Sequence, residues 1–226
     1  MNTITNIPDT DIYLLSYLDF ESIMALCSIS KNQYALMSSA KFIQEIHLLK
    51  DKHPFSYITC MIDFACQYNY ISLIKWIDAS INEFKYRCAI ECAAEAGNIE
   101  ILDWFDKSNY DFIYSNVIDK ASMNGKIEVL EWFDKSKYKF EYTDNAIDNA
   151  CARGYIEVLE WFKNSKYEFK YTRWAIDLAC RYNHIIVLDW FVKSGYEFKY
   201  KNAIAFAIEK NNIDVIEWFK NNSIWY

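Results

Sequence analysis

The stretch Gly154-Tyr155-Ile156-Glu157-Val158-Leu159-Glu160-Trp161-Phe162 decides the fold, because close variants of it recur along the chain. The copies lie 28 or 29 residues apart and are easiest to follow at their tryptophan: Trp76, Trp104, Trp132, Trp161, Trp190 and Trp218. An alanine keeps the same intervals: Ala65, Ala93, Ala121, Ala150, Ala179 and Ala207. So does an isoleucine: Ile62, Ile90, Ile118, Ile147, Ile176 and Ile204. Three columns in one register predict six structural repeats.

Each copy has the pattern of two short helices joined by a tight turn. In the fourth copy the first helix is expected around 146–150, where alanines at i and i+4 leave a thin face for close packing. The second is expected over 156–162, whose apolar residues form a broad stripe. Between them stands a residue that tolerates the left-handed conformation ending a helix. This column comprises Asn69, Gly97, Gly125, Gly154, Asn183 and Asn211.

A linker with alternating aromatic residues follows each second helix. In the fourth copy it reads Tyr167-Glu168-Phe169-Lys170-Tyr171, and related linkers begin at Tyr110, Tyr138 and Tyr196. The alternation is compatible with a short extended segment or with a packed loop, and both interpretations stay open at this point.

A helix pair of this size cannot bury its apolar face alone, so stacked copies are expected to share one core, as in a solenoid. The pair resembles the ankyrin repeat, because the residues from Gly154 to Leu159 are similar to that family's turn signature, Gly-His-Leu-Glu-Val-Val. The family's first-helix signature, Thr-Pro-Leu-His-x-Ala, is altered here. Ala146, Ile147 and Asp148 stand in the Pro, Leu and His positions.

The resemblance covers roughly residues 57–222. It implies an all-α, short ankyrin-like helix-turn-helix solenoid of about six 28–29-residue repeats over 55–226, preceded by an N-terminal helical bundle. The period falls short of the ankyrin value of about 33 residues, and the expected deletion is in the β-hairpin finger between repeats. Short units closed by Trp-Phe resemble ankyrin-repeat proteins of giant DNA viruses.

Residues 1–54 do not follow the repeat, and their apolar spacing predicts a small helical bundle. The order Ile7-Pro8, Leu15-Ser16-Tyr17-Leu18-Asp19 and Ile29-Ser30-Lys31 resembles an F-box, although Gln33 occupies that family's tryptophan position. The resemblance implies docking on the Skp1-like adaptor of cullin–RING ubiquitin ligases. The docking residues would be Pro8, Ile12, Leu15, Leu18, Ile23 and Leu26. The alternative is that the segment only caps the repeat array.

Composition limits the possible function classes. A chain of 226 residues with 53% hydrophobic residues is expected to fold, and its net charge of −7 offers no basic face for nucleic acid. The longest apolar run, Ala203–Ile208, is too short for a membrane span. The N-terminus lacks the pattern of a signal peptide. We therefore expect a cytoplasmic protein, in the host cell if it is viral, with reduced cysteines.

No catalytic, metal or cofactor site is predicted, so the chain is not expected to be an enzyme. The three histidines are far apart in sequence, and Cys88 and Cys92 have no second pair to complete a zinc site. Cys66, Cys151 and Cys180 share one small, buried repeat position. An acidic column is assigned to the first turn of each first helix, where a carboxylate favours the helix dipole. It comprises Asp63, Glu91, Asp119, Asp148 and Asp177.

Positions that vary between copies are the candidates for recognition. The tryptophan column lies on the core stripe and is interpreted as core, whereas the two residues before each turn vary most. In ankyrin-like proteins the matching positions line the concave face. A target-binding site is predicted in repeats four and five, where residue types typical of interface hot spots gather. It comprises Arg153, Arg173, Trp174, Arg181 and Tyr182. The alternative for Trp174 is packing on the aromatic linker.

These patterns favour a non-enzymatic adaptor whose repeats bind a target protein while the F-box-like segment recruits a ubiquitin ligase. The alternative is a plain ankyrin-type scaffold with a capping N-terminus. Protein is the expected partner, with no nucleic acid and no membrane. The chain is expected to be a monomer or an end-to-end dimer, because the last repeat ends near Trp225 without a polar cap.

Overall fold

The computed structural model describes residues 56–80, 86, 88–111 and 114–222. The F-box-like segment with its six predicted docking residues, and Trp225, lie outside these residues. The chain divides into two compact units, Met1–Cys92 and Ala93–Tyr226. Within the described residues every regular element is an α-helix, which confirms the predicted all-α class.

The helices come in pairs, a first and a second helix for each sequence repeat. The first unit holds α5 (Ser56–Gln67) and α6 (Ile71–Ser80), and α7 (Ala89–Ala96) crosses the boundary into the second. The second unit continues with α8 (Ile99–Lys107), α9 (Val117–Met123), α10 (Ile127–Lys135), α11 (Asn145–Arg153), α12 (Ile156–Asn164), α13 (Trp174–Arg181), α14 (Ile185–Ser194), α15 (Ala203–Glu209) and α16 (Ile213–Asn221).

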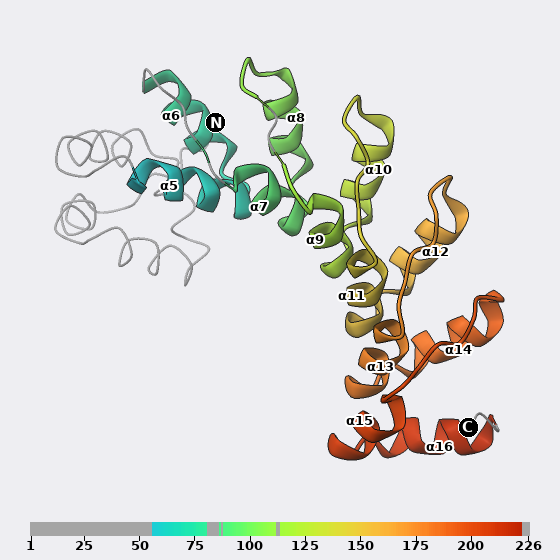
Figure 1. Ribbon diagram of the computed structural model, residues 1–226. Coiled ribbons are helices and arrows are strands. Elements are labelled where there is room, and N and C mark those ends of the chain that lie inside the picture. Colours follow the sequence, from blue (N-terminus) through green and yellow to red (C-terminus); the bar gives the residue numbers. More distant parts are fainter. Residues whose placement is uncertain (1–55, 81–85, 87, 112–113, 223–226) are drawn as a thin grey trace, which may run out of the picture. The chain divides into compact units, whose positions relative to one another are not determined.

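Small residues on the first helices allow them to pack closely in a row. In α11, Ala146, Ile147 and Ala150 are completely buried, and α11 packs extensively against both α9 and α13. The second helices contact one another much less. Figure 1 shows the result within the second unit: α9, α11, α13 and α15 form a close row, and their partners fan out from it.

Each turn has the left-handed residue that the sequence predicts. Gly154 has φ +76°, the Tyr155 N–H donates to the Ala150 carbonyl at 3.0 Å, and the Gly154 N–H donates to the Cys151 carbonyl at 3.2 Å. This is the Schellman arrangement that ends a helix. All six predicted positions have positive φ: Asn69, Gly97, Gly125, Gly154, Asn183 and Asn211.

Gly154 and Gly195 have similar backbone conformations but different surroundings, so substitutions at the two positions distinguish backbone strain from steric contact. A Cβ at Gly154 would lie 2.7 Å from the His184 Nδ1 of the next repeat, whereas a Cβ at Gly195, with φ +82°, would meet nothing within 4 Å. We expect Gly195→Ala to lower the free energy of unfolding by about 1 kcal/mol, the strain of a left-handed alanine. Gly154→Ala should lose about 1 kcal/mol more through the contact. Urea unfolding of both variants tests this, and equal losses would show that His184 moves aside freely.

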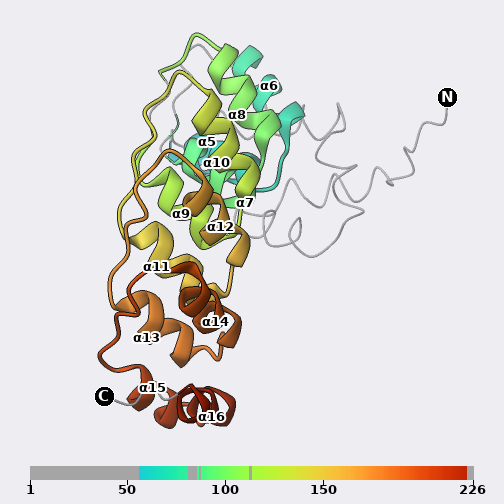
Figure 2. The ribbon, with the colours of Figure 1, turned by 90° about the vertical axis from the view of Figure 1, so that its right-hand side faces the viewer.

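A serine turns the chain out of four of the second helices, α8, α10, α12 and α14, into the linker. The Ser165 hydroxyl donates to the Phe162 carbonyl at 2.8 Å and accepts from the Tyr167 N–H at 3.2 Å. The same pair of bonds recurs at Ser108, Ser136 and Ser194. The linkers then run along one edge of the second unit (Figure 2).

The described linkers form no strand, and their aromatic rings pack instead. Phe140 stacks on Tyr167 at 4.0 Å between ring centroids and on Trp161 at 5.4 Å. Phe169 does the same in the next repeat, with Tyr196 at 4.3 Å and Trp190 at 5.4 Å. Of the two interpretations that the sequence leaves open, the packed loop is therefore the better description.

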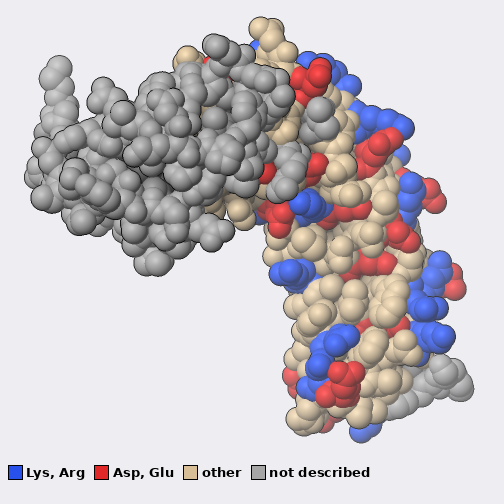
Figure 3. Space-filling model, turned by 60° about the vertical axis from the view of Figure 1, so that its left-hand side comes forward, with Lys and Arg blue, Asp and Glu red and all other residues tan. Residues whose placement is uncertain are grey.

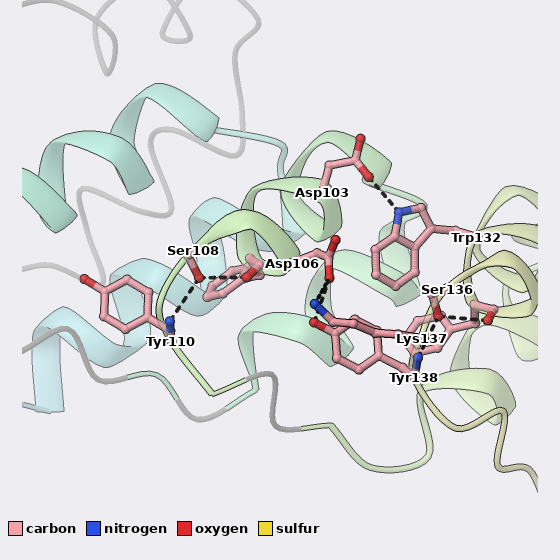
Figure 4. Close-up of polar contacts among 10 residues, drawn as sticks. Asp103, Asp106, Ser108, Tyr110, Trp132, Ser136, Lys137 and Tyr138 are labelled. Atoms are coloured by element: carbon pink, nitrogen blue, oxygen red, sulfur yellow. Dashed lines mark hydrogen bonds and ion pairs between the residues drawn. The ribbon is translucent and has the colours of Figure 1, made fainter.

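The tryptophan column is only partly core. Trp190 and Trp218 are buried, whereas Trp104, Trp132 and Trp161 are half-buried. Ring nitrogens tie neighbouring repeats together, since the Trp132 Nε1–H donates to Asp103 at 2.7 Å (Figure 4). The fully buried aromatic column is the phenylalanine that follows the tryptophan in the second to sixth copies: Phe105, Phe133, Phe162, Phe191 and Phe219.

Aspartates of the acidic column join one repeat to the next. Asp148 accepts hydrogen bonds from the Thr172 N–H at 2.9 Å and the Thr172 hydroxyl at 2.5 Å, just before α13 begins. Asp119 binds Thr143 in the same way. The predicted first-turn location holds for four members but is wrong for Asp63, because α5 begins seven residues earlier, at Ser56.

Candidate partner-binding face

The last two repeats carry most of the exposed apolar side chains. Among the described residues, Tyr68 is the single exposed large hydrophobic residue outside these repeats. The others are Trp174, Tyr182, Ile186, Val192, Ile208 and Ile213. The repeats share one backbone pattern, so the uneven distribution arises from the choice of side chains. It marks α13–α16 as the part of the surface where apolar side chains are exposed without a partner in the chain.

Three residues from two adjacent first helices form an aromatic and basic cluster, which we call the Trp174 cluster: Trp174, Arg181 and Phe206. The Trp174 side chain is 41% exposed, and its ring stacks on Phe206 of α15 with centroids 6.3 Å apart. The Arg181 guanidinium carbon lies 5.2 Å from the centre of the Phe206 ring. Trp174 therefore packs on the neighbouring first helix, and not on the aromatic linker that the sequence offers as an alternative.

The charged groups around this cluster are mainly arginines. The Arg173 guanidinium carbon lies 5.8 Å from the centre of the Trp174 ring, and Arg153 is exposed in the last turn of α11. Arg181 Nη2 is 3.9 Å from Glu209 Oε1, a long ion pair. Glu209 is held more closely by Lys210, at 3.0 Å, and this hydrogen bond lowers the pKa of its carboxyl.

The five predicted target-binding residues lie on the exposed side of the first helices, but they are not all brought into contact. Trp174 and Arg181 contact Phe206 and Arg173 contacts the Trp174 ring, whereas Arg153 ends α11 and Tyr182 caps α13. Figure 3 views the molecule from this side and shows separate basic and acidic spots within a largely uncharged surface.

Phe206 is the member of the cluster that the sequence analysis missed. Its repeat column contains Phe64, Cys92, Lys120, Asn149 and Leu178 in the preceding first helices, so the aromatic residue of the first copy returns only in the sixth. Phe206 stands outside the two variable positions before each turn, which are the positions that the sequence pattern offers for recognition.

Three buried thiols of the described residues are poor nucleophiles. Burial raises the pKa of the thiols of Cys66, Cys151 and Cys180, which keeps them protonated. Burial also lowers the pKa of His184, a half-buried residue at the start of α14. In the described ranges no three His, Cys, Asp or Glu side chains gather as metal ligands.

Within the part of the chain that the structure describes, none of the helices combines the length and apolar character needed to cross a membrane.

Comparison of the sequence with protein-family models gives no matching family, and comparison with curated proteins gives no matching relative.

Proposed function

We propose that this chain is a non-enzymatic protein-interaction module, an ankyrin-like solenoid that holds a target protein on the exposed side of its first helices. In the fuller form of the proposal the F-box-like segment engages a Skp1-like adaptor, so that the target is delivered to a cullin–RING ubiquitin ligase. The setting would be the cytoplasm of a host cell, if the chain is viral.

The observation that carries the proposal is the contrast between a repeating interior and a varying exterior. The interior positions repeat the same residue types in each copy, as a nearest-neighbour stack requires. On the outside, Trp174 has no counterpart in the other copies, whereas Tyr182 and Phe206 share their columns with Tyr68 and Phe64 of the first copy and differ from the second, third and fourth copies. Arginine and large aromatic residues are the types that contribute most at protein interfaces, so the variation falls where a partner would be recognised.

The alternative is a plain ankyrin-type binding protein whose N-terminal segment serves only as a cap. The two proposals share the target-binding face and differ only in residues 1–54. An end-to-end dimer remains compatible with both, since Ile208 and Ile213 are exposed in the last described helix pair.

Size-exclusion chromatography with a purified Skp1 homologue separates the two proposals. We expect the full chain to co-elute with the adaptor, and a Leu15→Asp, Leu18→Asp variant to elute alone. The matched control is Ile186→Asp, Val192→Asp, which introduces the same charge at two exposed apolar residues of α14 and should still co-elute.

Circular dichroism of all three proteins checks that they are folded. Loss of co-elution only in the variant of the N-terminal segment supports the adaptor proposal. If the wild-type chain elutes separately from the adaptor, the adaptor proposal fails and the plain binding protein is left.

A further inference from the structure

We propose that the partner held on the Trp174 cluster is an acidic protein segment with an apolar side chain between its carboxylates. This inference rests on the proposed function and names the chemistry of the partner. The structure supplies three arguments for it: the choice of arginine on this face, the apolar area beside the arginines, and the spacing between them.

The first argument is that arginine is concentrated here in a chain that otherwise uses lysine. Of the 24 basic residues only four are arginine, and three of these, Arg153, Arg173 and Arg181, lie on the exposed side of α11 and α13. Arginine differs from lysine in offering a planar fork that binds carboxylates through two parallel hydrogen bonds and that stacks on aromatic rings.

The arginines are also available to a partner, whereas many lysines are already engaged. Lys137 pairs with Asp106 and Lys166 with Asp134, each at 2.8 Å. Among the described residues no carboxylate lies within ion-pair distance of Arg153 or Arg173. Arg181 reaches only Glu209, at 3.9 Å, and its buried Nε atom has no hydrogen-bond partner. Asp144, at the start of α11, is a further carboxylate on this side of the first helices.

The second argument is the apolar surface between the basic groups. Trp174 stacks on Phe206, and the two rings lie between Arg173, which contacts Trp174, and Arg181, which contacts Phe206. The exposed part of the Trp174 ring offers a contact for an aliphatic or aromatic side chain. A nucleic acid could stack a base on such a ring, but the net charge of −7 opposes a partner with a charge on every phosphate. A protein segment with few carboxylates therefore fits the face better.

The third argument is the distance that the basic groups span. Arg173 and Arg181 stand at opposite ends of α13, which has eight residues and is therefore about 12 Å long. An extended peptide covers this distance in about four residues. The expected recognition pattern is therefore two acidic residues three or four positions apart, with an apolar residue between them.

A phage-displayed library of random 12-residue peptides, panned on the full chain, tests the proposal. Peptides with the expected pattern should be enriched on the wild type and on a Lys193→Glu, Lys220→Glu control, and should be lost on Arg153→Glu, Arg173→Glu. The two variants change the net charge equally, and all four residues are exposed. Circular dichroism of each protein confirms folding.

Fluorescence anisotropy with the most enriched peptide gives the magnitude. We expect Trp174→Ala to weaken binding by about tenfold or more, as at an interface hot spot. Wild-type binding should also weaken as the salt concentration rises, because the arginine–carboxylate attraction is screened. The salt dependence needs no variant, so it tests the electrostatic part even if a substitution disturbs folding.

Two results would overturn the inference and leave the proposed function standing. One is enrichment of neutral or basic peptides, or of peptides that bind the Arg153→Glu, Arg173→Glu variant equally well. The other is a single-stranded oligonucleotide that binds the wild type more tightly than the best peptide and depends on the same arginines, which would identify a polyanion site. If no peptide is enriched on any of the three proteins, the inference is contradicted, whereas the proposed function still stands or fails by the chromatography with the Skp1 homologue.

Discussion

Replacement of Phe162 by alanine is expected to lower the free energy of unfolding by about 4 kcal/mol, the range found for phenylalanine truncation in a core. The Phe162 side chain is 1% exposed and is surrounded by aromatic rings: Trp161 at 5.1 Å, Tyr142 at 5.0 Å and Phe140 at 6.3 Å between centroids. The rings cannot move into the cavity left by the substitution without breaking the stacking of Phe140 on Trp161 and Tyr167.

Urea unfolding followed by circular dichroism measures the effect, and Val192→Ala is the matched control. Val192 is 51% exposed at the end of α14, so its truncation should change stability by less than about 0.5 kcal/mol. Because each repeat contacts only its neighbours, weakening the fourth repeat should also reduce the slope of the urea transition, as the two sides unfold separately. A loss in the free energy of unfolding below about 1 kcal/mol, with an unchanged slope, would contradict the idea that the column of buried phenylalanines stabilises the stack of repeats.

The backbone of the repeat could be predicted because it depends on local chemistry. Each turn needs a left-handed residue, and only Gly or Asn meets this need cheaply. A reader of the sequence can therefore find Gly154 and Asn183 and place a helix on either side, as the structure confirms. The close packing of α11 could also be predicted, because the small side chains of Ala146 and Ala150 allow neighbouring helices to approach and both are buried.

The contacts between repeats were harder to predict, because they join residues about one period apart. The column of Asp148 was assigned to the helix dipole, which requires only its own helix. Its hydrogen bonds to Thr172 in the next repeat depend on the stacking geometry. A signal was present: a threonine stands 24 residues after both Asp119 and Asp148.

The candidate site was predictable in residue type but not in arrangement. Trp174 and Arg181 were selected because their columns vary, which depends on sequence alone. Their common contact, Phe206, comes from the next repeat and was not selected. The stacking of Trp174 on Phe206 requires knowledge of how closely α13 and α15 approach, and the sequence pattern gives the order of these helices but not their separation.

Replacement of Asp148 by alanine is expected to lower the free energy of unfolding by about 3 kcal/mol, because two hydrogen bonds to a carboxylate are lost and the Thr172 N–H is left without its acceptor. The Asp148 side chain is buried, at 5% exposure, so water replaces the lost acceptor poorly. Hydrogen exchange should locate the damage, with faster exchange of the Thr172 amide and the first turn of α13. Protection of that amide at the wild-type level would contradict the role of Asp148 in joining the two repeats.

The same residue predicts a pH dependence with a definite sign. Burial raises the pKa of the Asp148 carboxyl, and the hydrogen bonds from Thr172 oppose this only in part. A pKa higher in the folded chain than in the unfolded chain gives a contribution to stability that is full below the unfolded value of about 4. That contribution is lost as the pH rises through the folded pKa. Asp148→Asn keeps the shape of the side chain and removes the titration. The stability of the wild type relative to this variant should therefore fall as the pH is raised from about 4 to 7. If the relative stability rises over this range, the hydrogen bonds from Thr172 outweigh the effect of burial on the Asp148 carboxyl.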